Sequence, residues 1–493
     1  MEPKRGPGAR EKRKRAVVDY AAFDEGLGTE KPSTLSRWVP TLASVECLPA
    51  EAFVERMADG RGFDEAWARR TGLRRPALIA DAAGLGLAVP SGSFGVRDVA
   101  RIVGERTPVQ VMRSQDQSSV ENWSLADWAR YWHAPVREDT LNVISLEFSR
   151  TPLAAHVRSP ALVRRLDWID NCFPDAYRAR DEYPQTQYYC LMSTGGCYTD
   201  FHVDFGGTAV WYHVFRGRKV FYVLEPTAAH LAAYERWICD ADQDSTWFPD
   251  VAAAGGPCAC ARVEVRAGET FFIPSGWIHA VHTPADSLVF GGNFLPGLCT
   301  ADLQLAVHDI EARTHVKQEY RFPFFVPCMF WGVKCALDRL NERPDGLGSH
   351  ERRGLAALVD ACGAWARDGC ARIHCARQRG MALLAATDAG FDSPARLVDA
   401  AAAALARAPR PAPKFVFRAG PRPAERFVAA PPPPPAPEAV APRPAIAPAP
   451  DAPDAPAARS GGASPAAKKP RAAKPKAAST AKSRLLAKIS KKR

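Results

Sequence analysis

Two stretches of the chain, FHVDFGGT at residues 201–208 and GWIHAVHT at 276–283, carry the residue types of a metal centre. His202 and Asp204 are two positions apart, and residues i and i+2 of a β-strand point to the same face of a sheet. Their side chains could therefore bring an imidazole nitrogen and a carboxylate oxygen to one centre. The alternative is a structural His–Asp hydrogen bond inside a sheet, and the pair alone favours that alternative.

A third candidate ligand favours a metal site over a structural His–Asp hydrogen bond. His279 and His282 both lie at the start of a later predicted strand, and the spacing leaves the choice between them open. Two histidines and one carboxylate form a facial triad, which leaves three adjacent positions free on a six-coordinate Fe(II). Those positions suit a bidentate 2-oxo acid together with O2.

A 2-oxo acid also needs a cation for its distal carboxylate. The candidate is Lys219, at the start of KVFYVLEP, and the hydroxyl of Thr199 lies three residues before His202 and could share the contact. By spacing alone, the more common interpretation of Lys219 is an exposed lysine at the edge of a strand.

The segments that must position these residues are predicted to be strands. Short apolar and aromatic runs between about residues 140 and 297 are separated by Gly, Pro and Asp. The runs are LNVISLEF, QYYCLM, TAVWYHVF, KVFYVLEP, ARVEVR, ETFFIP and SLVFGGNFL. The predicted turns are FRGRK (215–219), RAGE (266–269), IPSGW (273–277) and TPADS (283–287). So many short strands indicate a closed or double-sheeted β architecture.

Helices are predicted on both sides of the strands. Residues 98–112 and 122–133 have a helical period, and Ser124 and Asp127 have the spacing of a capping box. The side chains predicted to share a buried face of the second helix are Trp123, Leu125, Trp128 and Trp132. After residue 300 the helical period returns in LQLAVHDIEARTHVK and continues in a helix-rich block to about residue 406.

Composition and charge are uneven along the 493 residues. From about residue 408 the chain is rich in Pro, Ala and Lys, which predicts disorder because too little apolar surface is available for a core. Residues 461–493 carry eleven Lys or Arg and no acid, equal to the net charge of +11, and a second basic cluster lies at 4–15. Such arms favour nuclear import and contact with nucleic-acid phosphates, and solvated tails are the alternative.

Other classes of protein are disfavoured. No apolar run has the length of a membrane span, and we expect no secretion signal. The thirteen cysteines lack the paired spacing of a zinc finger, so we expect mostly reduced, buried thiols. Cys258 and Cys260 form the tightest pair, and their spacing leaves zinc binding open.

Several of these motifs, in the same order, resemble the Jumonji-C histone lysine demethylases. The resemblance covers about residues 105–330 and is most similar to the branch of the F-box/zinc-CXXC and plant-homeodomain-finger demethylases. It rests on LNVISLEFSRTPL, RLDWIDNCFP, QYYCLMSTGGCYTDFHVDFGGTAVWYHVFRGRKVFYVLEPT and GETFFIPSGWIHAVHTPADSLVFGGNF. It implies a mainly β core, a double-stranded β-helix or cupin-like jelly roll, with helical flanks.

The resemblance also implies roles for particular residues. His279 corresponds to the family's second histidine ligand because it directly follows Gly-Trp-Ile, and His282 then has no role in the site. The implied iron ligands are His202, Asp204 and His279. The implied 2-oxoglutarate contacts are Thr199 and Lys219, with Asn142 and Tyr212 as further pocket residues near the cofactor and the substrate.

The implied activity is Fe(II)- and 2-oxoglutarate-dependent demethylation of a histone lysine, with loss of the methyl group as formaldehyde. Mono- or dimethylated lysine 36 of histone H3 is the first expected substrate. Lysine 9 or 27 of histone H3, hydroxylation of another protein side chain, and a chromatin adaptor with a degenerate site are the alternatives. The expected partners are the histone tail and nucleosome, with DNA contact through the basic tail, in the nucleus. The Cys/His spacing of the branch's reader fingers is absent from the sequence.

The predicted domain organisation has five parts. They are a basic disordered arm (1–20), a mostly helical flank (21–138), the Jumonji-C catalytic domain (139–306), a helical domain (307–407) and a disordered tail (408–493).

Overall fold

The computed structural model describes residues 42, 45–115, 119–120, 122–243, 246–254, 260–314, 316, 321–369 and 376–409. All of them belong to one compact unit of the chain, Met1–Val416. The predicted basic arm, the tail beyond residue 409 and Cys258 lie outside the described residues.

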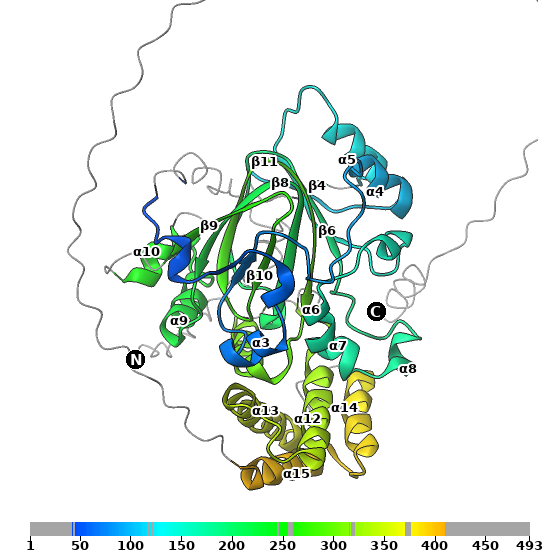
Figure 1. Cartoon of the computed structure of the whole chain (residues 1–493), viewed down its shortest axis with the longest axis vertical. Helices are drawn as coiled ribbons and strands as arrows, with labels where there is room; N and C mark the ends of the chain where they lie inside the picture. Colours follow the sequence, from blue (N-terminus) through cyan, green and yellow to red (C-terminus); the bar gives the residue numbers. More distant parts are fainter. Residues whose placement is uncertain are drawn as a thin grey trace, which may run out of the picture. The chain divides into compact units, whose positions relative to one another are not determined.

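In the described residues, eleven strands form one sheet. Figure 1 shows these strands at the centre of the fold, with helices around them. The order along the sheet is β1-β2-β10-β8-β11-β6-β5-β3-β4, with β7 paired to β11 and β9 paired to β8. The four N-terminal strands are β1 (Glu55–Met57), β2 (Ala77–Ile79), β3 (Val111–Arg113) and β4 (Ser119–Val120). The others are β5 (Leu141–Glu147), β6 (Tyr189–Ser193), β7 (Cys197–His202), β8 (Ala209–Leu224), β9 (Ala261–Arg266), β10 (Thr270–Ile273) and β11 (Ile278–Phe294).

The two long strands β8 and β11 give the core its double-sheeted form. They pair antiparallel along most of their length, from Ile278↔Leu224 to Phe294↔Ala209. At one end β7 pairs with β11 and β9 pairs with β8, whereas at the other end β6 pairs with β11 and β10 pairs with β8. Each long strand therefore takes part in two layers, which is the arrangement of a jelly roll. The predicted mainly β core with helical flanks is confirmed.

The long strands correct two of the predicted turns. FRGRK (215–219) lies inside β8 and TPADS (283–287) lies inside β11, so neither segment leaves the sheet. The register between the strands shifts three times between His282 and Val289, which marks β-bulges. Gly217 has a φ of 79°, and a Cβ there would lie 2.2 Å from the carbonyl oxygen of Asp286. Glycine therefore lets the paired strands bend together at a point that resembles a turn in sequence.

The predicted helix 98–112 is wrong over its second half. Helix α4 (Val96–Val103) ends at Gly104, and residues 111–113 form strand β3, which pairs with β5. Pro108 explains the difference, since proline cannot occupy a helix interior and its neighbours then adopt an extended conformation.

The predicted helix 122–133 is confirmed as α5 (Leu125–Trp132). Ser124 and Asp127 form the expected reciprocal capping box. Leu125 and Trp128 are fully buried, and Trp132 packs on Trp128 with a centroid distance of 5.9 Å. The expected mostly helical flank also contributes strands β1–β4, which join the same sheet as the core strands.

Further short helices connect the strands and cover the core. The remaining N-terminal ones are η2 (Ala50–Ala52), η3 (Gly60–Gly62) and α3 (Glu65–Thr71). Between β5 and β9 lie η4 (Pro152–His156), α6 (Ala161–Leu166), α7 (Trp168–Asn171), α8 (Asp175–Arg178), η5 (Phe205–Gly207), α9 (Ala228–Trp237) and α10 (Phe248–Ala253).

The helix-rich block after residue 300 is confirmed, and in Figure 1 α12–α15 gather at one end of the strands. Its elements are η7 (Gly297–Thr300), α11 (Ala301–Arg313), α12 (Phe325–Glu342), α13 (Ser349–Arg367), α14 (Ala376–Asp388) and α15 (Pro394–Arg407). The predicted boundary at 306/307 falls inside α11. None of the helices in the described part of the chain has the length and apolarity needed to cross a membrane.

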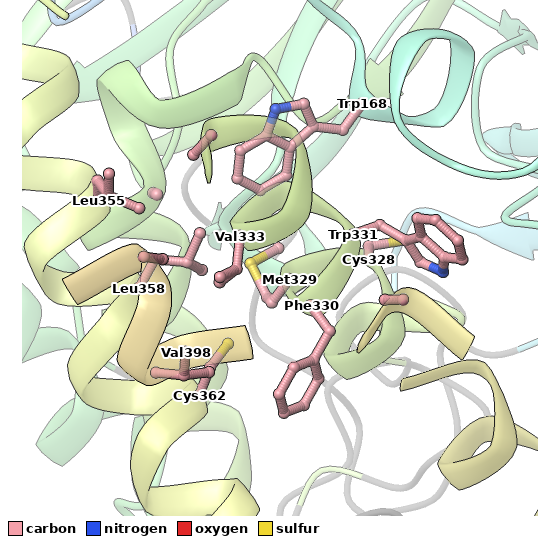
Figure 2. Close-up of a cluster of buried hydrophobic side chains, with 14 of the residues drawn as sticks. Trp168, Cys328, Met329, Phe330, Trp331, Val333, Leu355, Leu358, Cys362 and Val398 are labelled. Carbon is pink, nitrogen blue, oxygen red and sulfur yellow. The ribbon is translucent and has the colours of Figure 1, made fainter. Parts of the chain in front are cut away.

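The helical block shares a hydrophobic cluster with the segment that precedes β6. In Figure 2 the indole of Trp168, from α7, lies over α12 close to Met329 and Val333. A Cβ at Gly332 would lie 2.6 Å from two atoms of this indole ring. The close approach of α7 to α12 therefore depends on a glycine in the interior of a helix.

We expect Gly332→Ala to lower the free energy of unfolding. The Ala methyl overpacks a rigid ring at a cost of about 1–3 kcal/mol, which exceeds the gain of about 1 kcal/mol in helix propensity. Chemical denaturation measures the change. Gly380→Ala on α14 is the matched control, because nothing lies within 4 Å of its Cβ, and it should be neutral or stabilising. Equal effects of the two substitutions would contradict the predicted clash.

Candidate metal centre

The structure brings His202, Asp204 and His279 together. One ligand atom from each residue lies within 4.8 Å of the other two, and the residues are half-buried or buried. His202 is the last residue of β7 and pairs with His279, the second residue of β11. The two imidazole rings have a centroid distance of 4.2 Å, and His279 Nε2 lies 3.8 Å from Asp204 Oδ2.

From the sequence, His202 and Asp204 are expected on one strand, but in the structure only His202 lies on a strand. Strand β7 ends at His202, and Asp204 is the residue before the short helix η5. Its carboxylate therefore reaches the histidines from a loop and not through the alternation of a strand. Gly206 and Gly207 have φ values of 60° and 61°, which turn the chain sharply after the carboxylate.

The hydrogen bonds of the two histidines leave one nitrogen of each ring free for a metal. His202 Nδ1 lies 2.7 Å from the carbonyl oxygen of Asp200, and His279 Nδ1 lies 3.1 Å from that of Trp277. A carbonyl oxygen can only accept, so each Nδ1 carries a proton, and in the neutral form of each ring Nε2 then has a lone pair for a metal. Burial also lowers the pKa of His279 well below its usual value, with His202 acting in the same direction. Neutral imidazole is the form that binds metals.

The carboxylate of Asp204 is held by a partner that the sequence did not reveal. Asn293 Nδ2 donates to Asp204 Oδ1 at 3.0 Å and to Thr208 Oγ1 at 2.9 Å. Burial raises the pKa of Asp204, while His202 and the hydrogen bond from Asn293 act in the opposite direction. Two imidazoles and one oriented carboxylate, with no thiolate among them, match the donor set of a non-haem Fe(II) site.

The seven residues that the family resemblance assigns to the iron and 2-oxoglutarate site line a single cavity of about 610 Å³. They are Asn142, Thr199, His202, Asp204, Tyr212, Lys219 and His279. His282 is half-buried, is not among the residues that line the cavity, and pairs with Tyr198 and Val220 in the sheet. The spacing in the sequence left the choice between His279 and His282 open, and in the structure His279 lines the cavity whereas His282 does not.

Lys219 is a buried cation and not the exposed strand-edge residue that its spacing favours. It is 3% exposed, and its Nζ donates to Ser193 Oγ at 2.6 Å and to Thr283 Oγ1 at 2.7 Å. Within the described part of the chain, no carboxylate forms an ion pair with it. Burial lowers its pKa to about 8. An ammonium group has three donors, so one remains for an anion in the cavity.

The other pocket residues extend this arrangement. Ser193 Oγ donates to Asn142 Oδ1 at 2.7 Å, so a hydrogen-bonded chain runs from Lys219 through Ser193 to Asn142. Thr199 is buried on β7, beside Val281 of β11. Tyr212 packs edge-on against Phe221 with a centroid distance of 5.1 Å, and burial raises its pKa.

Sequence reasoning missed Ser193, Thr283, Asn293 and Glu311, although all but Thr283 line the cavity. Asn293 and Ser193 had a visible signal, because each is a polar residue within or at the end of a buried apolar run. Thr283 was obscured by its place in a predicted turn, and Glu311 by its place in an ordinary helical pattern.

Comparison with known proteins agrees with this geometry. The family model described as JmjC domain, hydroxylase, matches residues 189–294, which span β6 to β11. Lysine-specific demethylase 2B of Mus musculus is 43% identical over 293 residues, or 57% of this chain and 22% of its own length. Histone lysine demethylase PHF8 of Danio rerio is 40% identical over 295 residues, or 59% of this chain and 28% of its own.

The chain spans about a quarter of the length of these two relatives. It covers much more of JmjC domain-containing histone demethylation protein 1 of Yarrowia lipolytica, which is 37% identical over 359 residues, or 71% of this chain and 68% of its own length. The similarity thus extends on both sides of the strands that carry the triad. On these matches and this fold, the chain belongs to the JmjC-domain histone lysine demethylases.

Proposed function

We propose that the chain is an Fe(II)- and 2-oxoglutarate-dependent dioxygenase that removes methyl groups from a histone lysine as formaldehyde. One observation carries the proposal: a His–Asp–His cluster with both Nε2 atoms available shares a cavity with a buried lysine that forms no ion pair with a carboxylate of the described residues. The triad suits Fe(II) and leaves three sites for co-substrates, and Lys219 supplies the charge that a dicarboxylate needs.

The residues have separate roles in this proposal. His202, Asp204 and His279 would hold Fe(II), which supplies the oxidative chemistry when bound with 2-oxoglutarate and O2. Lys219, with Thr199 beside it, would bind the distal carboxylate. Asn142 and Tyr212 would line the space for the inner end of the cofactor and the methylated side chain. The apolar side chains of the cavity would limit the access of water, and the protein's contribution would be placement of one methyl group near the metal.

The substrate proposed first is mono- or dimethylated lysine 36 of histone H3. The names of the relatives support a histone lysine substrate in general. The same experiment would detect demethylation of lysine 9 or 27 of histone H3. The experiment loads the protein with Fe(II) and 2-oxoglutarate without oxygen, adds O2, and follows formaldehyde, succinate and peptide mass on a panel of methylated H3 peptides. Succinate with an oxidised peptide and no formaldehyde would support a hydroxylase, and no succinate would contradict the proposal.

We expect 2-oxoglutarate binding to weaken as pH rises above about 8. The folded-state pKa of Lys219 is depressed to about 8 by burial, so the ammonium form that attracts a carboxylate is complete below that pH and is lost above it. The Kd should be flat at lower pH and rise by about tenfold for each further pH unit. Anaerobic calorimetric titrations across pH measure this profile. A Kd that stays flat well above pH 8 would contradict the prediction.

We also propose nuclear action on nucleosomes, with the basic segment 461–493 contacting DNA phosphates. The eleven positive charges of this segment are its support. Deleting it should weaken nucleosome binding strongly at low salt and little at high salt, while turnover of a short peptide is unchanged. Binding assays across a salt series, with the full chain as the reference, measure the effect. Nucleosome affinity that is unchanged at every salt concentration would refute the role of the tail.

A further inference from the structure

The loop that carries Asp204 is fixed by a carboxylate on a distant helix. Glu311, on α11, accepts a hydrogen bond from the backbone N–H of Gly206 at 2.6 Å through Oε1. The two residues are 105 positions apart in the chain. The bonded amide lies two residues after the proposed ligand, at the point where the backbone turns with positive φ.

The packing around this loop leaves little freedom for it. A Cβ at Gly206 would lie 2.7 Å from Phe322 Cβ, and a Cβ at Gly207 would lie 2.9 Å from the Cα of Gln304 on α11. Helix α11 therefore presses directly on η5, and its Glu311 provides the polar contact at that interface. A side chain at either glycine would clash with these neighbours, so the close packing of the loop requires glycine at both positions.

Glu311 is a buried carboxylate, which packing against the loop alone would not require. It is 5% exposed and lines the same cavity as the triad. Its second oxygen, Oε2, has no hydrogen-bond partner among the described residues. Burial of a carboxylate with an unsatisfied oxygen costs free energy, so an apolar residue would be the more stable choice here. Among the described residues, the hydrogen bond that this carboxylate accepts comes from the loop of Asp204, and the nearby charge of Arg321 favours its ionised form.

We propose that Glu311 is a positioning residue of the metal centre, which holds the Asp204 loop in its metal-binding conformation before any metal arrives. Asn293 orients the carboxylate of Asp204 directly, and Glu311 fixes the backbone behind it. Outer contacts of this kind typically change metal affinity by about 10- to 100-fold. The inference rests on the proposed function, because it takes Asp204 as an Fe(II) ligand.

The test compares two substitutions of similar shape. Glu311→Gln keeps an oxygen that can accept from Gly206, whereas Glu311→Met fills the same space without an acceptor. We expect Glu311→Met to weaken Fe(II) binding by at least about tenfold and Glu311→Gln to stay within about threefold of wild type. Anaerobic calorimetry measures the affinity, and the visible spectrum of the Co(II) form reports the ligand geometry. Asp302→Asn, a carboxylate on the same helix that pairs with Arg74, is the matched control and should bind like wild type.

A second measurement needs no substitution and remains decisive if Glu311→Met does not fold. In the metal-free wild-type protein, hydrogen exchange of the segment 203–208 should already be slow, because the Gly206 amide is bonded to Glu311. Fast exchange that becomes slow only with metal would overturn the inference. So would equal Fe(II) affinities of the Met and Gln variants, whether both are normal or both are reduced. Failure of the wild-type protein to bind Fe(II) would instead contradict the proposed function.

Discussion

His202→Ala should abolish turnover while the protein remains folded. His202 is one of the three proposed ligands, and a metal centre contributes several kcal/mol of transition-state stabilisation, so the rate should fall by at least ~10³-fold. The side chain is half-buried at the end of β7 and lines the cavity, and it is not part of the hydrophobic core. Its removal therefore leaves the packing intact. Formaldehyde release, bound iron per chain and the thermal melting curve are the measurements.

His282→Ala is the matched control for this prediction. His282 is three residues after His279 on β11, but it lies outside the cavity. We expect this variant to bind iron and turn over like wild type. A folded, fully active His202→Ala protein would refute the metal assignment. Loss of iron in His282→Ala, with normal iron in His279→Ala, would show that the ligand had been assigned to the wrong histidine.

The parts of the fold that depend on neighbouring residues were predictable from sequence. The capping box of Ser124 and Asp127 and the turns at 266–269 and 273–277 are local patterns, and each is present in the structure. The triad was also predictable from local patterns. Its residue types seldom occur together, and the family resemblance aligned His279 with the second histidine ligand of the family. The family resemblance, and not spacing, selected between His279 and His282.

What sequence reasoning missed depends on contacts between distant residues. Gly and Arg in FRGRK favour a turn locally, but pairing with β11 keeps the segment in β8. Lys219 looks exposed because its hydroxyl partners, Ser193 and Thr283, lie 26 and 64 residues away. Asn293 is likewise 89 residues from Asp204. A polar residue in an apolar run can be noticed in the sequence, but its partner cannot, because the pairing of β11 with β6, β7 and β8 brings these distant residues together.

Lys219→Met should raise the KM for 2-oxoglutarate without reducing Fe(II) affinity. The substitution keeps most of the volume and the apolar contacts of the side chain but removes the charge. Loss of one partner from a buried, hydrogen-bonded charge pair costs about 2–5 kcal/mol, which corresponds to a rise in KM of ~30-fold to ~4 × 10³-fold. Fe(II) affinity should be unchanged because, among the described residues, Lys219 donates to Ser193 and Thr283 and to no residue of the triad. Steady-state kinetics and anaerobic titration separate the two effects.

The matched control is Lys334→Met on α12, whose ammonium pairs with Asp338 and Asp388 in the helical block. Its removal eliminates the same charge at a site outside the cavity, so the KM for 2-oxoglutarate should not change. Lys219→Arg tests whether charge alone is sufficient. Guanidinium is planar and larger, and the two hydroxyls hold a compact ammonium at 2.6 and 2.7 Å, so Arg should restore only part of the affinity. An unchanged KM in Lys219→Met would mean that the buried cation serves the fold and that the dicarboxylate binds elsewhere in the cavity.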